Sequence, residues 1–162
     1  MDYVVFNLKA YSLTDKIKSI DYNGYFWFFN ESSISNTSQR GFDKRIDIRV
    51  LFEKITSEVN PLSPELEYVK YYLKRYYVWY LLFSGRNASS NEFYRQYHLM
   101  KDWLKEHHQL SSISPLSRRV SGERFLSKIS MVIFLSMEKL SLVKLFAKFY
   151  CKGMTSTDVK DV

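Results

Sequence analysis

The sequence predicts a mainly α-helical fold, in which an N-terminal helix and a short β-hairpin precede four to five packed helices. Glycine and proline are scarce, with 5 and 3 among 162 residues, and this disfavours a turn-rich all-β fold. From residue 43 onward, apolar side chains recur at the spacing of amphipathic helices. Because 46% of the residues are hydrophobic and 25% are charged, the composition is that of a globular chain and excludes wholesale disorder.

The predicted strands lie near the N-terminus, after a first helix over residues 2–13. Residues 16–22 (KIKSIDY) alternate between two faces as a short strand does, and the Asn23-Gly24 pair that follows is a strong signal for a hairpin turn. The returning strand is the aromatic run YFWFF, residues 25–29. We expect these rings to pack in a core, because consecutive side chains alternate between the faces of a strand and cannot all contact a ligand.

Four helical segments follow, with proline, serine and glycine at their ends. Ser63 is placed to cap the second segment, with Pro64 at its first helical position, and Gly85 ends it. A serine-rich linker is predicted over 111–122, and a break near Glu138 is predicted in the last segment. The predicted segments are 43–59, 64–84, 90–109 and 123–151.

The chain divides into three parts by composition. Residues 1–41 hold the first helix, the hairpin and a polar loop, and residues 42–151 form a helical region. Residues 152–162 are expected to be a disordered tail.

The charge balance allows several kinds of partner. The formal net charge of +7 suits a phosphate-bearing ligand, an anionic membrane surface or nucleic acid. Lys144 and Lys148 lie beside leucine and phenylalanine in a predicted basic amphipathic helix, which suits either a solvated face or peripheral membrane contact. The basic side chains of Lys70, Lys74 and Arg75 are expected to form a solvated helix face.

Cysteine content and hydropathy indicate a compartment. Cys151 is the single cysteine, which excludes an internal disulfide and a cysteine-rich zinc site. The longest unbroken apolar runs are WYLLF and MVIFL, far short of the ~20 residues that a membrane span needs. We therefore expect a cytoplasmic protein, either soluble or peripheral to the inner face of the cell membrane.

Common catalytic motifs do not occur in the sequence. There is no zinc motif, phosphate-binding loop, G-x-S-x-G sequence or Cys-His nucleophile pair. Of the three histidines, His107 and His108 are adjacent and point in different directions, and His98 has Asp102 one helical turn away. Solvated surface histidines are therefore expected in preference to metal ligands.

The N-terminal segment carries a more specific pattern. It reads D-Y-V-V-F-N-L-K-A-x-x-L-x-D-K-I-K-S-I, then an aromatic strand, then N-x-S-S-I-S-N. Over residues 2–58 this order resembles the C-terminal end of the catalytic domain in family 2 GT-A glycosyltransferases. By this resemblance Asp2 is the catalytic base, which takes a proton from the acceptor hydroxyl as that hydroxyl attacks the anomeric carbon of a nucleotide sugar.

The same resemblance places substrate-binding residues in the loop after the aromatic strand. These are Asn30, Ser33 and Ser35. The residues themselves leave other roles open, because Asp2 equally suits a helix N-cap and the two serines equally suit capping within the loop.

The resemblance also implies a function. The chain would be the C-terminal portion of an inverting, nucleotide-sugar-dependent glycosyltransferase of bacterial polysaccharide or glycoconjugate synthesis. The complete enzyme would use a nucleotide sugar, an acceptor sugar and a divalent ion, Mg²⁺ or Mn²⁺, held by a D-x-D motif. Because no D-x-D occurs in these 162 residues, we expect no cofactor in this chain and no activity from it alone.

The sequence departs from the family pattern at several points. Met1 stands where the first residue of an acidic pair is found, so we expect the chain to begin inside a larger enzyme. Phe28 stands where many relatives carry arginine, which removes a phosphate or acceptor contact. The Q-x-x-R-W signature of processive polymerising members is absent, and this argues against a chitin- or cellulose-type synthase.

Two other classes of function compete with this interpretation. The run YVKYYLKRYYVWY, residues 68–80, interleaves aromatic and basic side chains as an RNA- or polyanion-binding surface does. Nucleic acid is nevertheless disfavoured, since acidic residues are scattered among the basic ones and no recognised binding motif is present. A non-catalytic helical interaction module is the other alternative. In either case, apolar side chains left uncovered near the N-terminus would favour a homo-oligomer.

Overall fold

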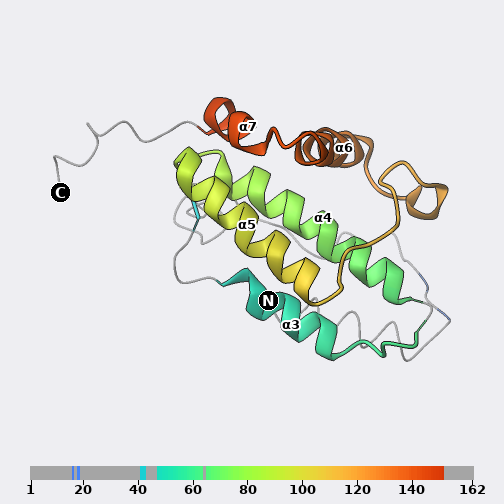
Figure 1. The fold of residues 1–162 in the computed structure, drawn as a ribbon. Coiled ribbons are helices and arrows are strands. Elements are labelled where there is room, and N and C mark those ends of the chain that lie inside the picture. Colours follow the sequence, from blue (N-terminus) through green and yellow to red (C-terminus); the bar gives the residue numbers. More distant parts are fainter. Residues whose placement is uncertain (1–15, 17, 19–40, 43–46, 64, 152–162) are drawn as a thin grey trace, which may run out of the picture.

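A computed structural model describes residues 16, 18, 41–42, 47–63 and 65–151. This part is mainly α-helical, as predicted (Figure 1). Its elements are α3 (Ile48–Ser57), α4 (Leu66–Gly85), α5 (Ser90–Glu106), the short 3₁₀ helix η2 (Arg118–Val120), α6 (Phe125–Lys139) and α7 (Val143–Tyr150). The predicted first helix, the returning aromatic strand and the tail lie outside the described residues, as does the strand over 16–22 apart from Lys16 and Lys18.

The helices stack in three layers (Figure 1). Helices α4 and α5 form the middle layer, with α6 and α7 on one side and α3 on the other. Helix α6 packs on α4, and α7 packs on both α5 and α6. On the far side, the Phe52 ring of α3 lies 5.4 Å from Trp103 of α5 and 6.2 Å from Tyr76 of α4. The middle layer is therefore covered on both faces by aromatic contacts.

Two helices begin at side-chain caps. Asp47 precedes α3 and accepts a hydrogen bond from the Arg49 N–H at 3.0 Å, and Ser89 precedes α5 and accepts one from the Glu92 N–H at 3.2 Å. Helix α4 differs from the prediction, because it begins at Leu66 and no side chain caps it. The Ser63 hydroxyl instead accepts from the Glu65 N–H at 3.3 Å and donates to the Glu65 carboxylate, so it holds the turn before the helix.

Two helices end at residues with positive φ. Helix α5 was predicted to reach residue 109 and stops at Glu106, where His108 has φ 54° and the Gln109 N–H donates back to the Leu104 carbonyl at 2.7 Å. The predicted break in the last helical segment is confirmed, and it lies just beyond Glu138, where Ser141 has φ 58°. Both ends are Schellman motifs in which histidine or serine replaces the usual glycine.

The segment predicted as a linker is anchored to α4. The half-buried ammonium of Lys74 donates to the carbonyls of Ser111 and Ile113 at 2.9 and 2.8 Å, and burial lowers its pKa. The Glu67 carboxylate accepts from the N–H and hydroxyl of Ser112 at 3.1 and 2.8 Å. The prediction that Lys74 lies on a solvated helix face is therefore wrong. Its ammonium instead anchors the segment between α5 and α6 to α4.

The core is one cluster with aromatic rings at its centre. Phe93 of α5 is fully buried, and its ring lies 6.0–6.4 Å from the rings of Phe42, Phe134, Phe146 and Tyr150. Cys151 closes the cluster after α7, and burial raises the pKa of its thiol to about 11. In the part of the chain that the structure describes, no helix combines the length and the apolar character that crossing a bilayer requires.

Candidate functional site

The residues predicted from the N-terminal pattern lie outside the described part of the chain. This applies to Asp2, Asn30, Ser33 and Ser35, and to the aromatic strand beside them. Their roles as catalytic base and substrate-binding residues therefore stay predictions.

The three histidines are exposed, as predicted, and two of them also contact aromatic rings. His107 stacks on Trp103 with ring centroids 4.2 Å apart, and its Nδ1 lies 2.8 Å from the Trp103 carbonyl oxygen. His98 packs against the edges of Tyr94 and Tyr97, and its Nδ1 is 3.9 Å from Asp102. Across the described ranges, no three His, Cys, Asp or Glu side chains converge as metal ligands do.

A polar cluster joins α5 to α6 and has a structural explanation. The Lys101 ammonium lies 2.9 Å from the Glu138 carboxylate and 2.8 Å from the Tyr97 hydroxyl. Partial burial acts to lower the pKa of Lys101, but these two hydrogen bonds prevail and raise it to about 12. The lysine is thus held in its charged form, which suits an ion pair between helices and not a general base.

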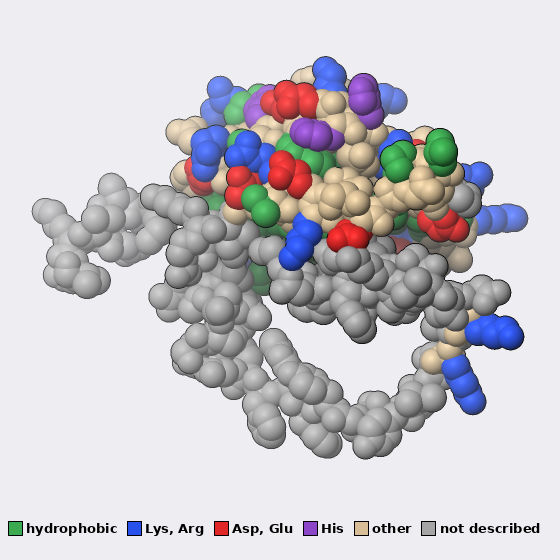
Figure 2. All heavy atoms as spheres, turned by 90° about the horizontal axis from the view of Figure 1, so that it is seen from below, with side chains coloured by type: hydrophobic (Ala, Val, Ile, Leu, Met, Phe, Trp, Pro, Cys, Tyr) green, Lys and Arg blue, Asp and Glu red, His purple; other side chains and the backbone are tan. Residues whose placement is uncertain are grey.

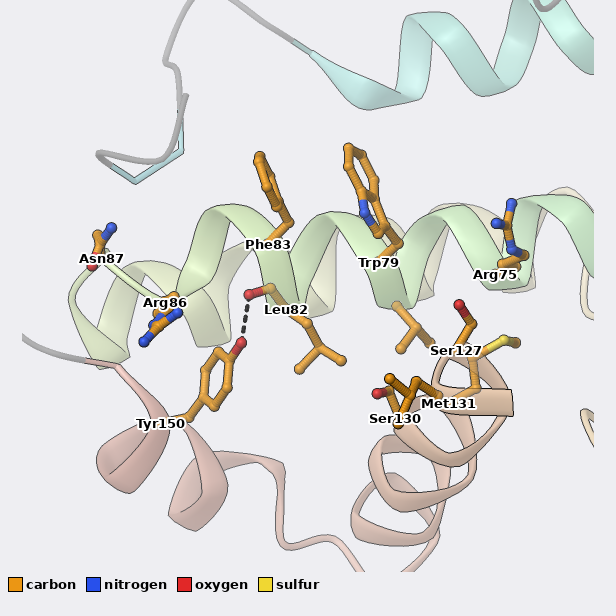
Figure 3. Close-up of a pocket in the computed structure, with 12 residues that line it drawn as sticks. Arg75, Trp79, Leu82, Phe83, Arg86, Asn87, Ser127, Ser130, Met131 and Tyr150 are labelled. Atoms are coloured by element: carbon orange, nitrogen blue, oxygen red, sulfur yellow. Dashed lines mark hydrogen bonds between the residues drawn. The ribbon is translucent and has the colours of Figure 1, made fainter. Parts of the chain in front are cut away.

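The most site-like feature is a cleft of about 670 Å³ along α4, bounded by α6 and the end of α7 (Figure 3). This volume falls in the range of small-molecule sites. The described lining residues come from α4 and the turn after it, from α6, and from α7: Arg75, Val78, Trp79, Leu82, Phe83, Arg86, Asn87, Leu126, Ser127, Ser130, Met131 and Tyr150.

Aromatic rings of α4 form one part of the lining. Trp79 and Phe83 stack with centroids 5.1 Å apart and an interplanar angle of 14°, and Tyr76 lies 5.4 Å from Trp79. Trp79 remains 49% exposed, so part of its indole is accessible. Figure 3 shows Ser127, Ser130 and Met131 on α6, with Leu82 of α4 reaching toward them. Trp79 and Phe83 project from the side of α4 that faces away from these serines (Figure 3). The cleft therefore has flat apolar rings along one edge and hydroxyl groups along the other.

An arginine stands at each end of the cleft (Figure 3). Arg75 pairs with Glu123 at 2.8 Å. At the other end, the Tyr150 hydroxyl donates to the Leu82 carbonyl at 2.6 Å and ties α7 to α4. Burial raises the pKa of Tyr150, and the positive charge of nearby Arg86 partly opposes this. Arg86 forms no ion pair with a carboxylate of the described residues, so its guanidinium is available to an anion.

The lining is suited to binding. Sites of this kind use aromatic walls with a few fixed polar groups, and guanidinium groups bind phosphate and carboxylate in a bidentate manner. None of the described lining side chains is a carboxylate, imidazole or thiol, so they supply no general base at neutral pH. The arrangement fits a ligand that has both a ring face and an anionic group.

Four of the residues that line the cleft lie at helical spacing along α4 and its C-cap. Arg75, Trp79, Leu82 and Arg86 follow one another at intervals of four, three and four residues, which places them on one face of a helix. Of these four residues only Arg75 was predicted to lie on a solvated basic face. Nothing in the local sequence shows that α6 and α7 pack beside that face.

Comparison with models of protein families, with curated proteins and with solved structures finds no match for this chain.

Proposed function

We propose that the chain carries the C-terminal part of an inverting, nucleotide-sugar-dependent glycosyltransferase of family 2 GT-A, in bacterial polysaccharide or glycoconjugate synthesis. The observation that carries the proposal is the ordered sequence pattern over residues 2–35, in which Asp2 opens the predicted first helix and Asn30, Ser33 and Ser35 follow the predicted aromatic strand. In this role Asp2 is the base that deprotonates the acceptor hydroxyl.

The complete enzyme acts in the cytoplasm, at the inner face of the cell membrane. Its N-terminal half supplies the D-x-D motif that binds Mg²⁺ or Mn²⁺ and the diphosphate of the nucleotide sugar. This chain alone therefore transfers nothing, because metal and diphosphate binding belong to that half.

The α4 cleft is the acceptor site in this proposal. Its Trp79 face suits a sugar ring, its serine hydroxyls suit sugar hydroxyls, and Arg86 suits a phosphate or carboxylate on the sugar. The helical region would then select the acceptor, while the N-terminal pattern supplies the chemistry.

The genomic DNA upstream of the Met1 codon tests the assignment to this family. We expect the reading frame to continue upstream and to encode an acidic residue close to Asp2 and a D-x-D motif further away. The protein expressed from that longer frame should transfer sugar from a UDP- or GDP-sugar in the presence of Mn²⁺, whereas residues 1–162 alone should not. An open frame without D-x-D would contradict the proposal. A stop codon shortly before Met1 would leave only a degenerate gene of this family, without activity.

Titration with glucose 1-phosphate, followed by NMR, tests the cleft. We expect the indole N–H signal of Trp79 and the amide signals of Ser127 and Arg86 to shift, because the probe offers a ring and a phosphate. Arg86→Gln should abolish the shifts of Trp79 and Ser127, since it removes the charge that is unpaired among the described residues. Arg124→Gln, a surface change that lies outside the cleft lining, is the matched control and should leave them unchanged. No shift of the Trp79 signal at millimolar probe, or equal loss in both variants, would exclude the cleft as the acceptor site.

A further inference from the structure

Helix α6 exposes a continuous apolar face. Only Met131 and Phe134 of this helix are buried. Phe125, Ile129 and Ile133 follow one another every four residues on the opposite side, and Leu126 lies beside them. Phe125 and Leu126 are 73% and 76% exposed, which is unusual for side chains of this size.

Helix α7 also exposes apolar side chains on the side away from the core. It buries Val143 and Ala147 against the rest of the fold. Its exposed apolar residues are Leu142, Leu145 and Phe149, at intervals of three and four residues, and Phe149 is 83% exposed. Helices α6 and α7 lie on the same side of the α4–α5 layer (Figure 1). We refer to their exposed apolar residues together as the α6–α7 outer face. Exposed apolar patches on a soluble domain mark protein or membrane interaction sites.

Lysines border this face on both helices. Lys128 and Lys139 are eleven residues apart, close to three helical turns, and so lie on one flank of α6. On α7, Lys148 is exposed, and Lys144, one turn before it, extends toward α5, with its Nζ 5.9 Å from the centroid of the Tyr94 ring. Three arginines in the segment before α6 contribute further positive charge near this helix: Arg118, Arg119 and Arg124.

The acidic residues of this region do not offset these charges at the surface. Between Ser117 and Cys151 there are seven Lys and Arg residues but two Glu residues. Glu123 is paired with Arg75 of α4 and Glu138 with Lys101 of α5, so both carboxylates are neutralised by the middle layer. Among the described residues, neither Lys139 nor Lys148 forms an ion pair with a carboxylate. The outer face therefore joins exposed phenylalanine and leucine to unbalanced positive charge.

Figure 2 views the molecule from the side away from α6 and α7, and where described residues are visible it shows hydrophobic, acidic, basic and histidine side chains interspersed. Positive charge beside exposed aliphatic and phenyl groups is the pattern of helices that lie in the interface of an anionic bilayer. We infer that the α6–α7 outer face binds an anionic lipid surface, with Phe125 and Phe149 inserted among the acyl chains. This inference does not depend on the proposed glycosyltransferase function.

Vesicle flotation of the purified chain tests the inference. We expect binding to phosphatidylglycerol-rich vesicles, little binding to pure phosphatidylcholine, and release as salt is raised, because salt screens the lysines. The double variant Phe125→Ala/Phe149→Ala should lower the affinity at least about ten-fold, since each phenyl group loses its burial. Replacing Lys128, Lys139 and Lys148 by Gln should lower the affinity for these vesicles about a hundred-fold. Each basic side chain near an anionic membrane contributes a factor of about five.

Matched controls lie away from the outer face. Val50 and Leu62 are 59% and 91% exposed on α3 and on the loop after it, and Val50→Ala/Leu62→Ala should leave vesicle binding unchanged. All variants should keep the helical circular dichroism signal of the parent, because none of these side chains is buried. Equal binding to both lipids, or equal loss in the control, would overturn the inference. So would a dimer that Phe125→Ala/Phe149→Ala dissociates while the parent ignores vesicles, since that result would assign the face to a second copy of the chain.

Discussion

Replacement of Phe93 by alanine is expected to lower the free energy of unfolding by about 3–5 kcal/mol, the usual cost of truncating a buried phenylalanine. Phe93 is fully buried, and its ring touches four other rings, from α6, α7 and the segment before α3. Those partners belong to different elements, so the cavity cannot close by the movement of one side chain. Urea denaturation followed by circular dichroism measures the loss.

Phe149→Ala is the control for this prediction. The substitution is the same and also lies on a helix, but Phe149 is 83% exposed. Its removal should change the stability by less than about 0.5 kcal/mol, as surface substitutions generally do. A similar loss in the two variants, or a loss below about 1 kcal/mol for Phe93→Ala, would contradict the packing described for the core.

The helices of the described region were predictable because their signal is local. The apolar spacing indicated α3, α4 and α5, and a break near Glu138 was predicted in the last segment. The exact ends were not predictable in the same way. His108 and Ser141 terminate helices in a left-handed conformation that favours glycine, and neither residue type signals it.

The cleft was not predictable because its residues meet only through tertiary packing. Arg75 and Tyr150 are far apart in the sequence, and only the docking of α6 and α7 brings them to the same groove. The linker over 111–122 was judged from its serine content, and the role of Lys74 in anchoring it depends on carbonyl groups that no sequence pattern reveals. Predictions about Asp2, Asn30, Ser33 and Ser35 rest on a pattern in residues that the structure does not describe.

The end of α4 packs so closely on α5 that it has no room for a side chain. A Cβ atom at Gly85 would lie 2.3 and 2.7 Å from two ring carbons of Phe93, far inside van der Waals contact, and 3.3 Å from the ring of Phe42. Gly85 is the last residue of α4 and does not have positive φ, so its backbone would accept alanine without strain. Only the contact with Phe93 requires glycine here.

Gly85→Ala should therefore destabilise the fold, although the same change inside a helix normally stabilises it by up to about 1 kcal/mol. The Phe93 ring is enclosed by other rings and cannot retreat without moving α6 or α7. Overpacking of this kind costs about 1–3 kcal/mol, and we expect a net loss of about 2 kcal/mol in urea denaturation. Gly122→Ala is the matched control, since a Cβ there meets nothing within 4 Å, and its stability should be unchanged or slightly higher.

A second substitution identifies the clash itself as the cause. In a Phe93→Ala background the ring carbons that oppose the new methyl group are gone, so Gly85→Ala should cost at least about 1 kcal/mol less than it does in the parent chain. This coupling arises only if the methyl group and the ring compete for the same space. An equal cost in both backgrounds would assign the loss to the helix end instead of to the contact between α4 and α5. If Gly85→Ala stabilises the otherwise unchanged chain, the close approach of α4 to α5 at this position is contradicted.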